Sequence, residues 1–174
     1  KSLTRALRVH SGRDQSGTIS IRHRGGGVRR RFRIISTLEQ LGRHTGTVTT
    51  IEYDPNRSAR IALVKDESGK MIYILAPDVL QVGHIIESNE KAEISVGNRM
   101  SLNAIPSGIE IHSVELFPQG GVRVAQSAGA AAVIVSKEGD YAQVRFPSGE
   151  IRKIQLRSHA SIGKIGNLSH STIR

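Results

Sequence analysis

Residues 23–31, with the sequence HRGGGVRRR, combine the side chains of this chain that are best suited to chemistry with an anion. Gly25, Gly26 and Gly27 carry no Cβ, so their backbone could approach a phosphodiester closely and present N–H donors to its oxygens. Arginines flank the glycines on both sides, and a guanidinium can bind a phosphate through two parallel hydrogen bonds. The segment therefore predicts a phosphate-binding loop. A flexible surface loop is the alternative that these residues leave open.

A second run of small residues places Gly120 and Gly121 beside Arg123, and the triplet 127–129 (Ser-Ala-Gly) follows. Small residues there could admit an RNA backbone next to the cation. A tight corner of a β-barrel would require the same residues, because a sharp bend leaves little room for side chains. Both interpretations stay open at this point.

The chain offers no candidate catalytic centre. It has no cysteine and no Gly-x-Ser-x-Gly elbow, and its glycine-rich segment lacks the Gly-x-Gly-x-x-Gly spacing and the following helix of a nucleotide-binding loop. None of the seven histidines lies at a metal-ligand spacing with a nearby acid. Asp54, in Asp-Pro-Asn, is expected to cap a turn. We therefore expect a protein that is not an enzyme and uses no cofactor and no metal.

The positive charge is concentrated near the start of the chain. Residues 1–33 hold ten cations against the single acid Asp14, whereas the other 141 residues hold fifteen cations and fourteen acids. A weaker excess lies in residues 143–174, with six cations against Glu150. The ten early cations are Lys1, Arg5, Arg8, Arg13, Arg22, Arg24, Arg29, Arg30, Arg31 and Arg33.

This charge indicates a polyanionic partner. The formal net charge is +10 and the pI is near 10.7, values at which a protein attracts phosphate-bearing molecules. Nucleic acid is favoured over a membrane surface. No stretch approaches the roughly 18 apolar residues needed to cross a bilayer, so we expect no membrane partner.

The six aromatic residues bear on the kind of nucleic acid. They are Phe32, Tyr53, Tyr73, Phe117, Tyr141 and Phe146. Most of them fall within strand patterns, where core packing would claim them. Proteins that bind single strands normally stack bases on exposed rings, so we expect this chain to hold a folded RNA by its phosphates and its shape. A free single-strand-binding protein and a hydrolase acting on an anionic substrate are the rival functions.

Short runs of alternating and β-branched residues predict a mainly β chain. Expected strands cover residues 18–22, 31–35, 47–53, 60–65 and 71–75, and a second set covers residues 99–105, 109–116, 132–136, 141–146 and 150–155. The first two carry arginines and are expected to form a strand pair. Residues 77–81 are the best candidate for a helical turn. A polar loop at residues 88–93 separates the two sets, with a domain boundary near residues 96–98, and each set has the size of a small barrel.

Ordered blocks along the whole chain closely resemble the family of large-subunit ribosomal protein two. Near the start these blocks are Gly12-Arg13 with Gly17, residues 21–27 (IRHRGGG) and residues 30–33 (RRFR). Further along they are residues 51–59 (IEYDPNRSA), 73–77 (YILAP), 105–106 (IP), 111–112 (IH), 127–129 (SAG), 147–150 (PSGE), 152–153 (RK) and 166–167 (GN), and finally His170. The resemblance runs from about residue 11 to the last residue.

The resemblance implies an all-β protein, with an OB-fold barrel and a basic N-terminal arm in residues 1–95 and an SH3-like barrel in residues 96–174. It implies a structural constituent of the large ribosomal subunit that binds large-subunit rRNA and supports the peptidyl-transferase region and subunit association. The implied partners are that rRNA and neighbouring ribosomal proteins.

The expected rRNA contacts are basic residues from both strand sets, together with the glycine triplet and two histidines. Those near the start are Arg13, Arg22, His23, Arg24, Gly25, Gly26, Gly27, Arg29, Arg30, Arg31, Arg33 and Arg57. A second contact surface is expected from Arg123, Arg152, Lys153, Arg157, Lys164 and His170.

The sequence departs from the family pattern in places. Val28 stands where the family usually has histidine, and Gln126 stands where it often has arginine, so one backbone contact at each place is expected to be lost. The family continues into a basic tail rich in histidine and glycine, and we expect that tail to be lacking here or carried by a separate chain. Residues 5–8 (RALR) are similar to plant-type mitochondrial members, which predicts a ribosome of the mitochondrial matrix, with the bacterial cytoplasm or a plastid as alternatives.

Overall fold

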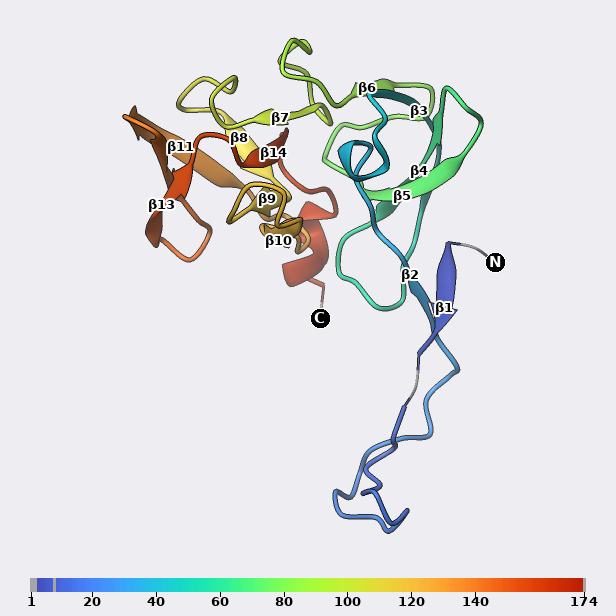
Figure 1. The fold of residues 1–174 in the computed structure, drawn as a ribbon. Helices are drawn as coiled ribbons and strands as arrows, with labels where there is room; N and C mark the ends of the chain where they lie inside the picture. Colours follow the sequence, from blue (N-terminus) through green and yellow to red (C-terminus); the bar gives the residue numbers. More distant parts are fainter. Residues whose placement is uncertain (1–2, 8, 174) are drawn as a thin grey trace. The chain divides into compact units, whose positions relative to one another are not determined.

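The computed structural model describes residues 3–7 and 9–173, so three of the cations, Lys1, Arg8 and Arg174, lie outside the described residues. Over the described range the chain is all-β, with fourteen strands and two short 3-10 helices, as the sequence predicts (Figure 1). No helix in that range is long and apolar enough to span a membrane. The structure divides into two compact units, Lys1–Ile34 and Ile35–Arg174, and each is described by itself.

The first unit is a long loop closed at its base by two short antiparallel strands (Figure 1). β1 (Thr4–Ala6) pairs with β2 (Arg31–Arg33). The guanidinium of Arg5 lies over the ring of Phe32, 4.7 Å from its centroid, and this cation–π contact supports the pair. We call residues 9–33 the basic arm.

The strand expected at residues 18–22 is not formed, so its expected pairing with residues 31–35 is wrong. Instead, the amides of Ser20 and Ile21 both donate to the carbonyl of Gly12, at 3.0 and 3.1 Å. These two hydrogen bonds fold the loop back on itself. Ile19 and Ile21 are 58% and 55% exposed. An alternating pattern specifies a strand only where one face is buried, and here no core receives the two isoleucines.

The first sheet of the second unit has four antiparallel strands in the order β5-β4-β3-β6. These strands are β3 (Thr45–Glu52), β4 (Ile61–Asp66), β5 (Met71–Leu75) and β6 (Ile85–Glu87). Their buried side chains form one cluster with Leu38, which precedes the 3-10 helix η1 (Glu39–Leu41): Val48, Ala62, Val64, Ile72 and Ile86. This sheet is the OB-fold barrel, and three of its four strands were predicted.

Residues 77–81 do not form the expected helical turn. Val79 has a φ of 66°, which lies in the left-handed region that a right-handed helix excludes. Pro77 forms a bridge with Ile165, and the next amide, that of Asp78, donates to the carbonyl of Lys164 at 2.7 Å. Pro77 therefore begins a segment whose backbone pairs with the other barrel.

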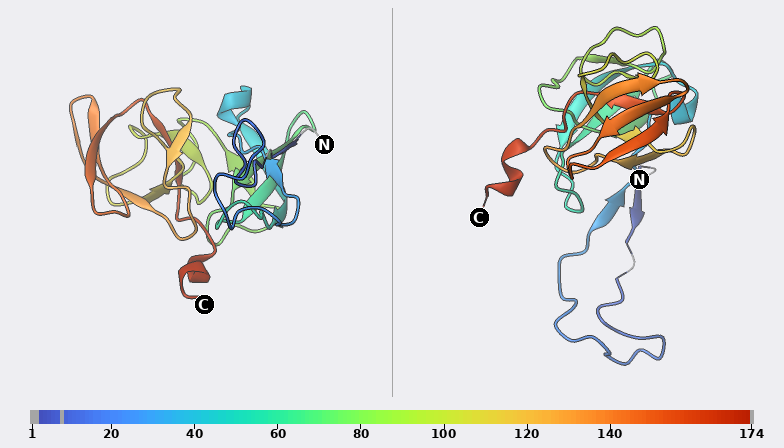
Figure 2. Two further views of the ribbon diagram at one scale, coloured as in Figure 1. Left: turned by 90° about the horizontal axis from the view of Figure 1, so that it is seen from below. Right: turned by 90° about the vertical axis from the view of Figure 1, so that its left-hand side faces the viewer.

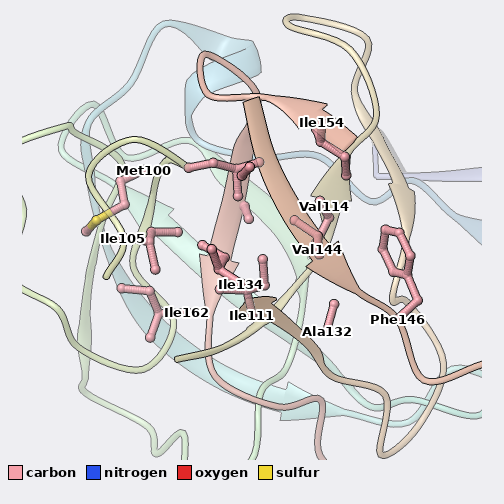
Figure 3. Packing of buried hydrophobic residues seen from close by; sticks show 13 residues of the cluster. Met100, Ile105, Ile111, Val114, Ala132, Ile134, Val144, Phe146, Ile154 and Ile162 are labelled. Atoms are coloured by element: carbon pink, nitrogen blue, oxygen red, sulfur yellow. The ribbon is translucent and has the colours of Figure 1, made fainter. Parts of the chain in front are cut away.

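The second sheet has six strands in the order β13-β12-β11-β8-β14-β7. They are β7 (Arg99–Ser101), β8 (Glu110–His112), β11 (Ala132–Glu138), β12 (Tyr141–Arg145), β13 (Ile151–Gln155) and β14 (His159–Ile162). Thirteen buried side chains gather on its inner face, among them Ile111, Ile134 and Val144 (Figure 3). This is the SH3-like barrel. The strands expected at residues 132–136, 141–146 and 150–155 are confirmed.

The strand expected at residues 109–116 is broken at Ser113, which has a φ of 51°. After the break, β9 (Val114–Glu115) leaves the six-stranded sheet and pairs with β10 (Val122–Val124). The amide of Ser113 donates to the carbonyl of Ala125 at 3.0 Å. The apolar residues change phase across the break, from positions 109 and 111 to positions 114 and 116. This shift marks the break, but nothing in the local sequence identifies β10 as the new partner.

Within the second unit, residues 165–167 join the two barrels. The amide of Gly166 donates to the carbonyl of Ala76 at 3.1 Å, and the side-chain amide of Asn167 donates to the carbonyl of Ser58 at 2.7 Å. A small apolar cluster accompanies these bonds and consists of Ala59, Ile61, Leu75 and Ile165. Residues 89–98 form the expected loop. The division into domains 1–95 and 96–174 stays a prediction.

Candidate nucleic-acid interface

The glycine triplet lies in the exposed part of the basic arm, where all residues from 13 to 31 are exposed. His23, Gly25 and Gly26 have φ values of 60°, 110° and 75°, in the left-handed region. Glycine adopts this region without a steric penalty, and histidine is one of the side chains that tolerate it. The three residues therefore turn the backbone sharply while keeping it open to solvent.

The arm glycines serve two different purposes. At Gly12 an added Cβ would collide with the carbonyl oxygen of Ile21, and at Gly25 it would come within 2.8 Å of the Cβ of Ser11, so the fold itself requires these two. At Gly26 and Gly27 an added Cβ would meet nothing within 4 Å. Gly27 also has no left-handed φ. The space beside Gly27 is therefore free of protein atoms. A partner's backbone that lies close to the loop would need such a space.

The only acid of the basic arm, Asp14, is engaged in a turn. Its Oδ1 accepts hydrogen bonds from the hydroxyl of Ser16 at 2.7 Å and from the amides of Ser16 and Thr18 at 2.9 and 3.0 Å. The hydrogen bond from the Ser16 hydroxyl is the main reason why the pKa of Asp14 is below its usual range, and the backbone hydrogen bonds lower the pKa further. Asp14 thus shapes the arm and stays ionised near neutral pH, where it offsets one arginine.

The predicted contact residues of the arm are all at its surface. Arg13, Arg22, His23, Arg24, Arg29, Arg30 and Arg31 are exposed, and Arg33 is partly buried. The Nη1 of Arg13 donates to the carbonyl of Gly17 at 2.8 Å, and the Nε of Arg31 donates to the hydroxyl of Thr4 at 3.0 Å. A guanidinium has five N–H donors, so the first of these bonds orients Arg13 and leaves it able to bind a phosphate.

Arg57, also a predicted contact, has a structural partner. Its Nε donates to Oδ2 of the fully buried Asp54 at 3.0 Å, while Oδ1 of Asp54 accepts from the amide of Asn56 at 2.9 Å. Asp54 therefore caps the Asp-Pro-Asn turn, which confirms that prediction. The same pair fixes the direction of the Arg57 side chain, which is about one-fifth exposed.

The residues predicted for a second contact surface come from several separate elements. Arg123 is exposed on β10, Lys164 follows β14, and His170 lies in the 3-10 helix η2 (Leu168–Ser171). Arg152 and Lys153 are neighbours on β13, so their side chains point to opposite sides of the sheet. Arg157 is exposed just after β13. Arg152 also forms an ion pair, with its Nε 2.7 Å from Glu150 Oε1, which raises the pKa of Arg152.

Sequence reasoning missed a buried ion network in the second unit. Arg99 is only 3% exposed, and its guanidinium donates to Glu39 at 3.2 Å, to Glu115 at 2.8 Å and to the carbonyl of Ser113 at 2.9 Å. The Nδ1 of His159 lies 3.2 Å from a carboxylate oxygen of Glu39, close enough for an ion pair although its angle does not meet hydrogen-bond geometry. These residues come from η1, β7, β9 and β14, so the network ties both barrels together.

His112, next to this network, is fully buried. Its Nδ1 lies 3.0 Å from the carbonyl of Gly163, to which the ring donates in its neutral form. Burial, with a smaller contribution from the charge of Arg99, lowers the pKa of His112 to about 4. The histidine is therefore a neutral structural donor. Among the described residues, no group of three or more His, Asp or Glu side chains is placed to hold a metal ion.

The expectation that core packing would claim most aromatic rings is wrong. Phe146 is buried, but Tyr53 and Phe117 are 71% and 70% exposed, and Tyr141 is 45% exposed. Tyr141 alternates with buried neighbours, so its place in a strand pattern was correct. The strand has two faces, however, and the sequence does not say which face a tyrosine takes.

Two family models match the chain. The model described as "Ribosomal Proteins L2, RNA binding N-terminal domain" matches residues 1–88, and the model described as "Ribosomal Proteins L2, C-terminal domain" matches residues 95–174. Together they cover nearly all of the chain, in the order in which the two barrels follow one another.

Proposed function

Because this chain belongs to the ribosomal protein L2 family, which makes it a structural, RNA-binding protein of the large ribosomal subunit, we propose that the basic arm is its principal contact with large-subunit rRNA. The observation that carries the proposal is the exposed row of arginines in residues 13–31 with one acid, Asp14, among them. Arginine suits this role because its planar fork matches the phosphate oxygens and stays charged at any physiological pH.

In this proposal the arm works by neutralising phosphates at short range. Arg22, Arg24 and Arg29 supply charge, and the open space beside Gly26 and Gly27 lets the sugar-phosphate backbone come close. Phosphate contacts fix position and orientation without reading the base sequence. Shape recognition of this kind suits a folded rRNA, whose helices expose phosphates and 2′-hydroxyls.

The second contact surface is proposed with the same function. Arg123, Arg157 and Lys153 are exposed on different elements of the SH3-like barrel, so they would reach different parts of the RNA. Arg152, Lys164, His170 and Arg57 complete the proposed set. By bridging separate RNA segments, the chain would support the peptidyl-transferase region and the association of the two subunits, as the family resemblance implies.

The proposed compartment is the mitochondrial matrix. Its support is the similarity of residues 5–8 to plant-type mitochondrial members. Immunodetection of the endogenous protein in purified mitochondrial, plastid and cytosolic ribosomes tests it. Signal confined to ribosomes from another compartment would contradict the proposal.

Salt dependence of RNA binding tests the central proposal. With about six to ten phosphate contacts, affinity for in vitro transcribed large-subunit rRNA should fall by on the order of 10³ to 10⁵ between 50 and 200 mM salt. In parallel, the native protein should co-sediment with large subunits. A flat salt response, or a protein found only in the free pool, would contradict the proposal.

A second function, binding of unstructured single strands, is favoured by the exposed ring of Tyr53. Exposed aromatic side chains are the platforms on which such proteins stack bases. The two functions differ in their preferred ligand. Binding to oligouridylate as tight as binding to folded rRNA would favour the single-strand function, whereas a large preference for rRNA favours the ribosomal one.

A further inference from the structure

β11, β12 and β13 lie side by side (Figure 2, right), and the proposed contact set only partly uses their outer face. Side chains alternate along β12: Ala142 and Val144 point into the core, as Figure 3 shows for Val144, and Tyr141, Gln143 and Arg145 lie on the opposite face. Ile154 of β13 is buried in the same core. The outer face is therefore formed by residues whose neighbours in the chain build the core.

The strand register determines what lies side by side on this face. Opposite one another are Tyr141 and Gln155, Gln143 and Lys153, and Arg145 and Ile151. On the other side of Tyr141 lies the exposed Glu138 of β11, whose Oε1 accepts a hydrogen bond from the side-chain amide of Gln143 at 3.1 Å. The face thus combines an aromatic ring, two amides, two cations, one acid and Ile151. Its edge strand β13 is exposed at Ile151, Lys153 and Gln155. Amides, cations and an exposed ring are the groups that proteins use to bind unstacked nucleotides.

At one end of this face the structure has a hollow of about 280 Å³, lined by Asp140, Tyr141, Gln155, Leu156 and Arg157. The amide of Leu156 donates to the carbonyl of Asp140 at 2.9 Å, which holds the two sides of the hollow together. Pockets for drug-sized ligands run from about 300 to 1,000 Å³. This hollow lies just below that range, so its size suits a single nucleotide unit.

We propose that this hollow receives a single unstacked nucleotide of the rRNA, with its base stacked on Tyr141. In that arrangement the side-chain amide of Gln155 binds a base edge, and Arg157, the one cation of the lining, binds the phosphate. Asp140 is an acceptor for an amino group or a 2′-hydroxyl and keeps phosphate at the Arg157 end. Arg145 and Lys153, farther along the face, hold the adjoining sugar-phosphate backbone.

This inference rests on the proposed rRNA-binding function and adds a base-stacking contact to it. Tyr141 was not among the predicted contacts, and Arg145 was not either. A stacking contact differs physically from the phosphate contacts of the basic arm, because it releases no counterions. Loss of the ring should therefore lower affinity at every salt concentration alike, without changing the slope against salt.

The test compares full-length variants for binding to in vitro transcribed large-subunit rRNA over a salt series. Tyr141→Ala should lose about 5- to 150-fold in affinity with an unchanged slope, because stacking one base on a ring contributes about 1–3 kcal/mol. Tyr141→Phe keeps the ring and should bind like wild type. Phe117→Ala, which removes an exposed ring outside the hollow, is the matched control and should also bind like wild type.

Each other outcome overturns the inference in a recognisable way. If Tyr141→Ala binds like wild type, or loses no more than Phe117→Ala, the ring does not stack a base, and the proposed function still stands. If Tyr141→Phe loses as much as Tyr141→Ala, the hydroxyl acts and stacking does not. If wild type itself does not bind rRNA, the proposed function fails, and the inference fails with it. Normal RNA binding but defective assembly of Tyr141→Ala would assign the hollow to a protein.

A measurement on the wild-type complex guards against a variant that fails to fold. After irradiation at short ultraviolet wavelength and digestion with trypsin, residues 138–145 form one peptide, in which Tyr141 is the only aromatic residue. A nucleotide adduct on Tyr141 is expected. Adducts on peptides of the basic arm with none on residues 138–145 would overturn the inference.

Discussion

Arginine has two opposite uses in this molecule. In the basic arm, Arg22, Arg24 and Arg29 are exposed along a loop that buries almost nothing. In the second unit, Arg99 is buried and held between the carboxylates of Glu39 and Glu115. An exposed cation keeps its charge available for a partner. A buried cation has its charge balanced inside the protein and contributes to the fold.

The difference follows from the cost of burying charge. A cation removed from water costs several kcal/mol unless charges and hydrogen bonds inside the protein replace the lost hydration. For Arg99, two carboxylates and one carbonyl replace the lost hydration. Residues 1–33 hold ten cations and one acid, so most of this positive charge is not balanced by acids of the same segment. The comparison therefore predicts that stability and RNA binding can be altered separately.

The largest effect is expected for Arg99→Met, which leaves Glu39 and Glu115 without their shared cation. Removing one partner of a buried ion pair destabilises a protein by about 3–5 kcal/mol, and urea unfolding of the purified protein measures the loss. Arg123→Met removes an exposed arginine of the same barrel and should change stability by about 0.5 kcal/mol or less. Equal stability of the two variants would break the comparison.

Acid should weaken the fold through His112. Its pKa is about 4 in the folded protein and 6.5 when unfolded, so between these values the unfolded state binds the proton and the folded state does not. Stability from the neutral ring is present above pH 6.5 and is lost as the pH falls towards 4, by about 3 kcal/mol in all. Urea midpoints from pH 7.5 to 4 test this. In His112→Asn, which keeps a donor for Gly163, this part of the pH dependence should vanish.

The arm should show the opposite behaviour. The triple variant Arg22→Gln, Arg24→Gln, Arg29→Gln should bind rRNA on the order of 10²-fold more weakly at physiological salt, with a salt slope lower by about 2 to 3. Its urea midpoint should match that of wild type, because these side chains are exposed. A loss of stability with unchanged RNA binding would reverse the roles assigned to the two groups of arginines.

The smallest effect is expected for a methyl group at Gly27. Gly27→Ala meets no protein atom within 4 Å, so its stability should stay within a few tenths of a kcal/mol of wild type. Its rRNA affinity should fall by up to about 10-fold, because the added methyl group would displace one contact between the RNA backbone and the loop, and such a contact contributes about 1.4 kcal/mol. Gly26→Ala is the matched control with a left-handed φ, and it should also lose about 1 kcal/mol of arm stability. Unchanged affinity in both would show that no RNA backbone lies against the triplet.

The fold could be predicted where the sequence alternates over a buried face. Residues 141–145 send Ala142 and Val144 to a core, and this alternation marks the strand. Residues 61–64 are a continuous apolar run that is largely buried on both faces, so the run marks a strand without marking an inner side. Three-residue strands such as β1, β6 and β10 are too short to show a period, and they exist because a neighbouring strand supplies hydrogen bonds. The break at Ser113 likewise depends on a partner, β10, that local sequence does not reveal.

The exposed part of the candidate site could be predicted, because a segment with seven arginines and one acid cannot balance its positive charge with its own acids. Arg99 could not, since its acids lie 60 and 16 positions away in the sequence and only the fold brings them to it. The position of Tyr141 on the outer face could not be predicted either, because it too depends on the fold. The sequence marked the strand correctly, and the packing of Ala142 and Val144 against the core decided which way the ring faces.

The way the last strands close the barrels determines the order of events during synthesis. β14 inserts between β8 and β7, and Asn167 reaches Ser58 across 109 positions of the chain. During synthesis, the arginine-rich segment therefore leaves the ribosome long before the two barrels can be completed. Contacts this far apart also make folding slow. The arginine-rich segment is therefore synthesised before the strand that completes the second sheet and the residues that join the two barrels.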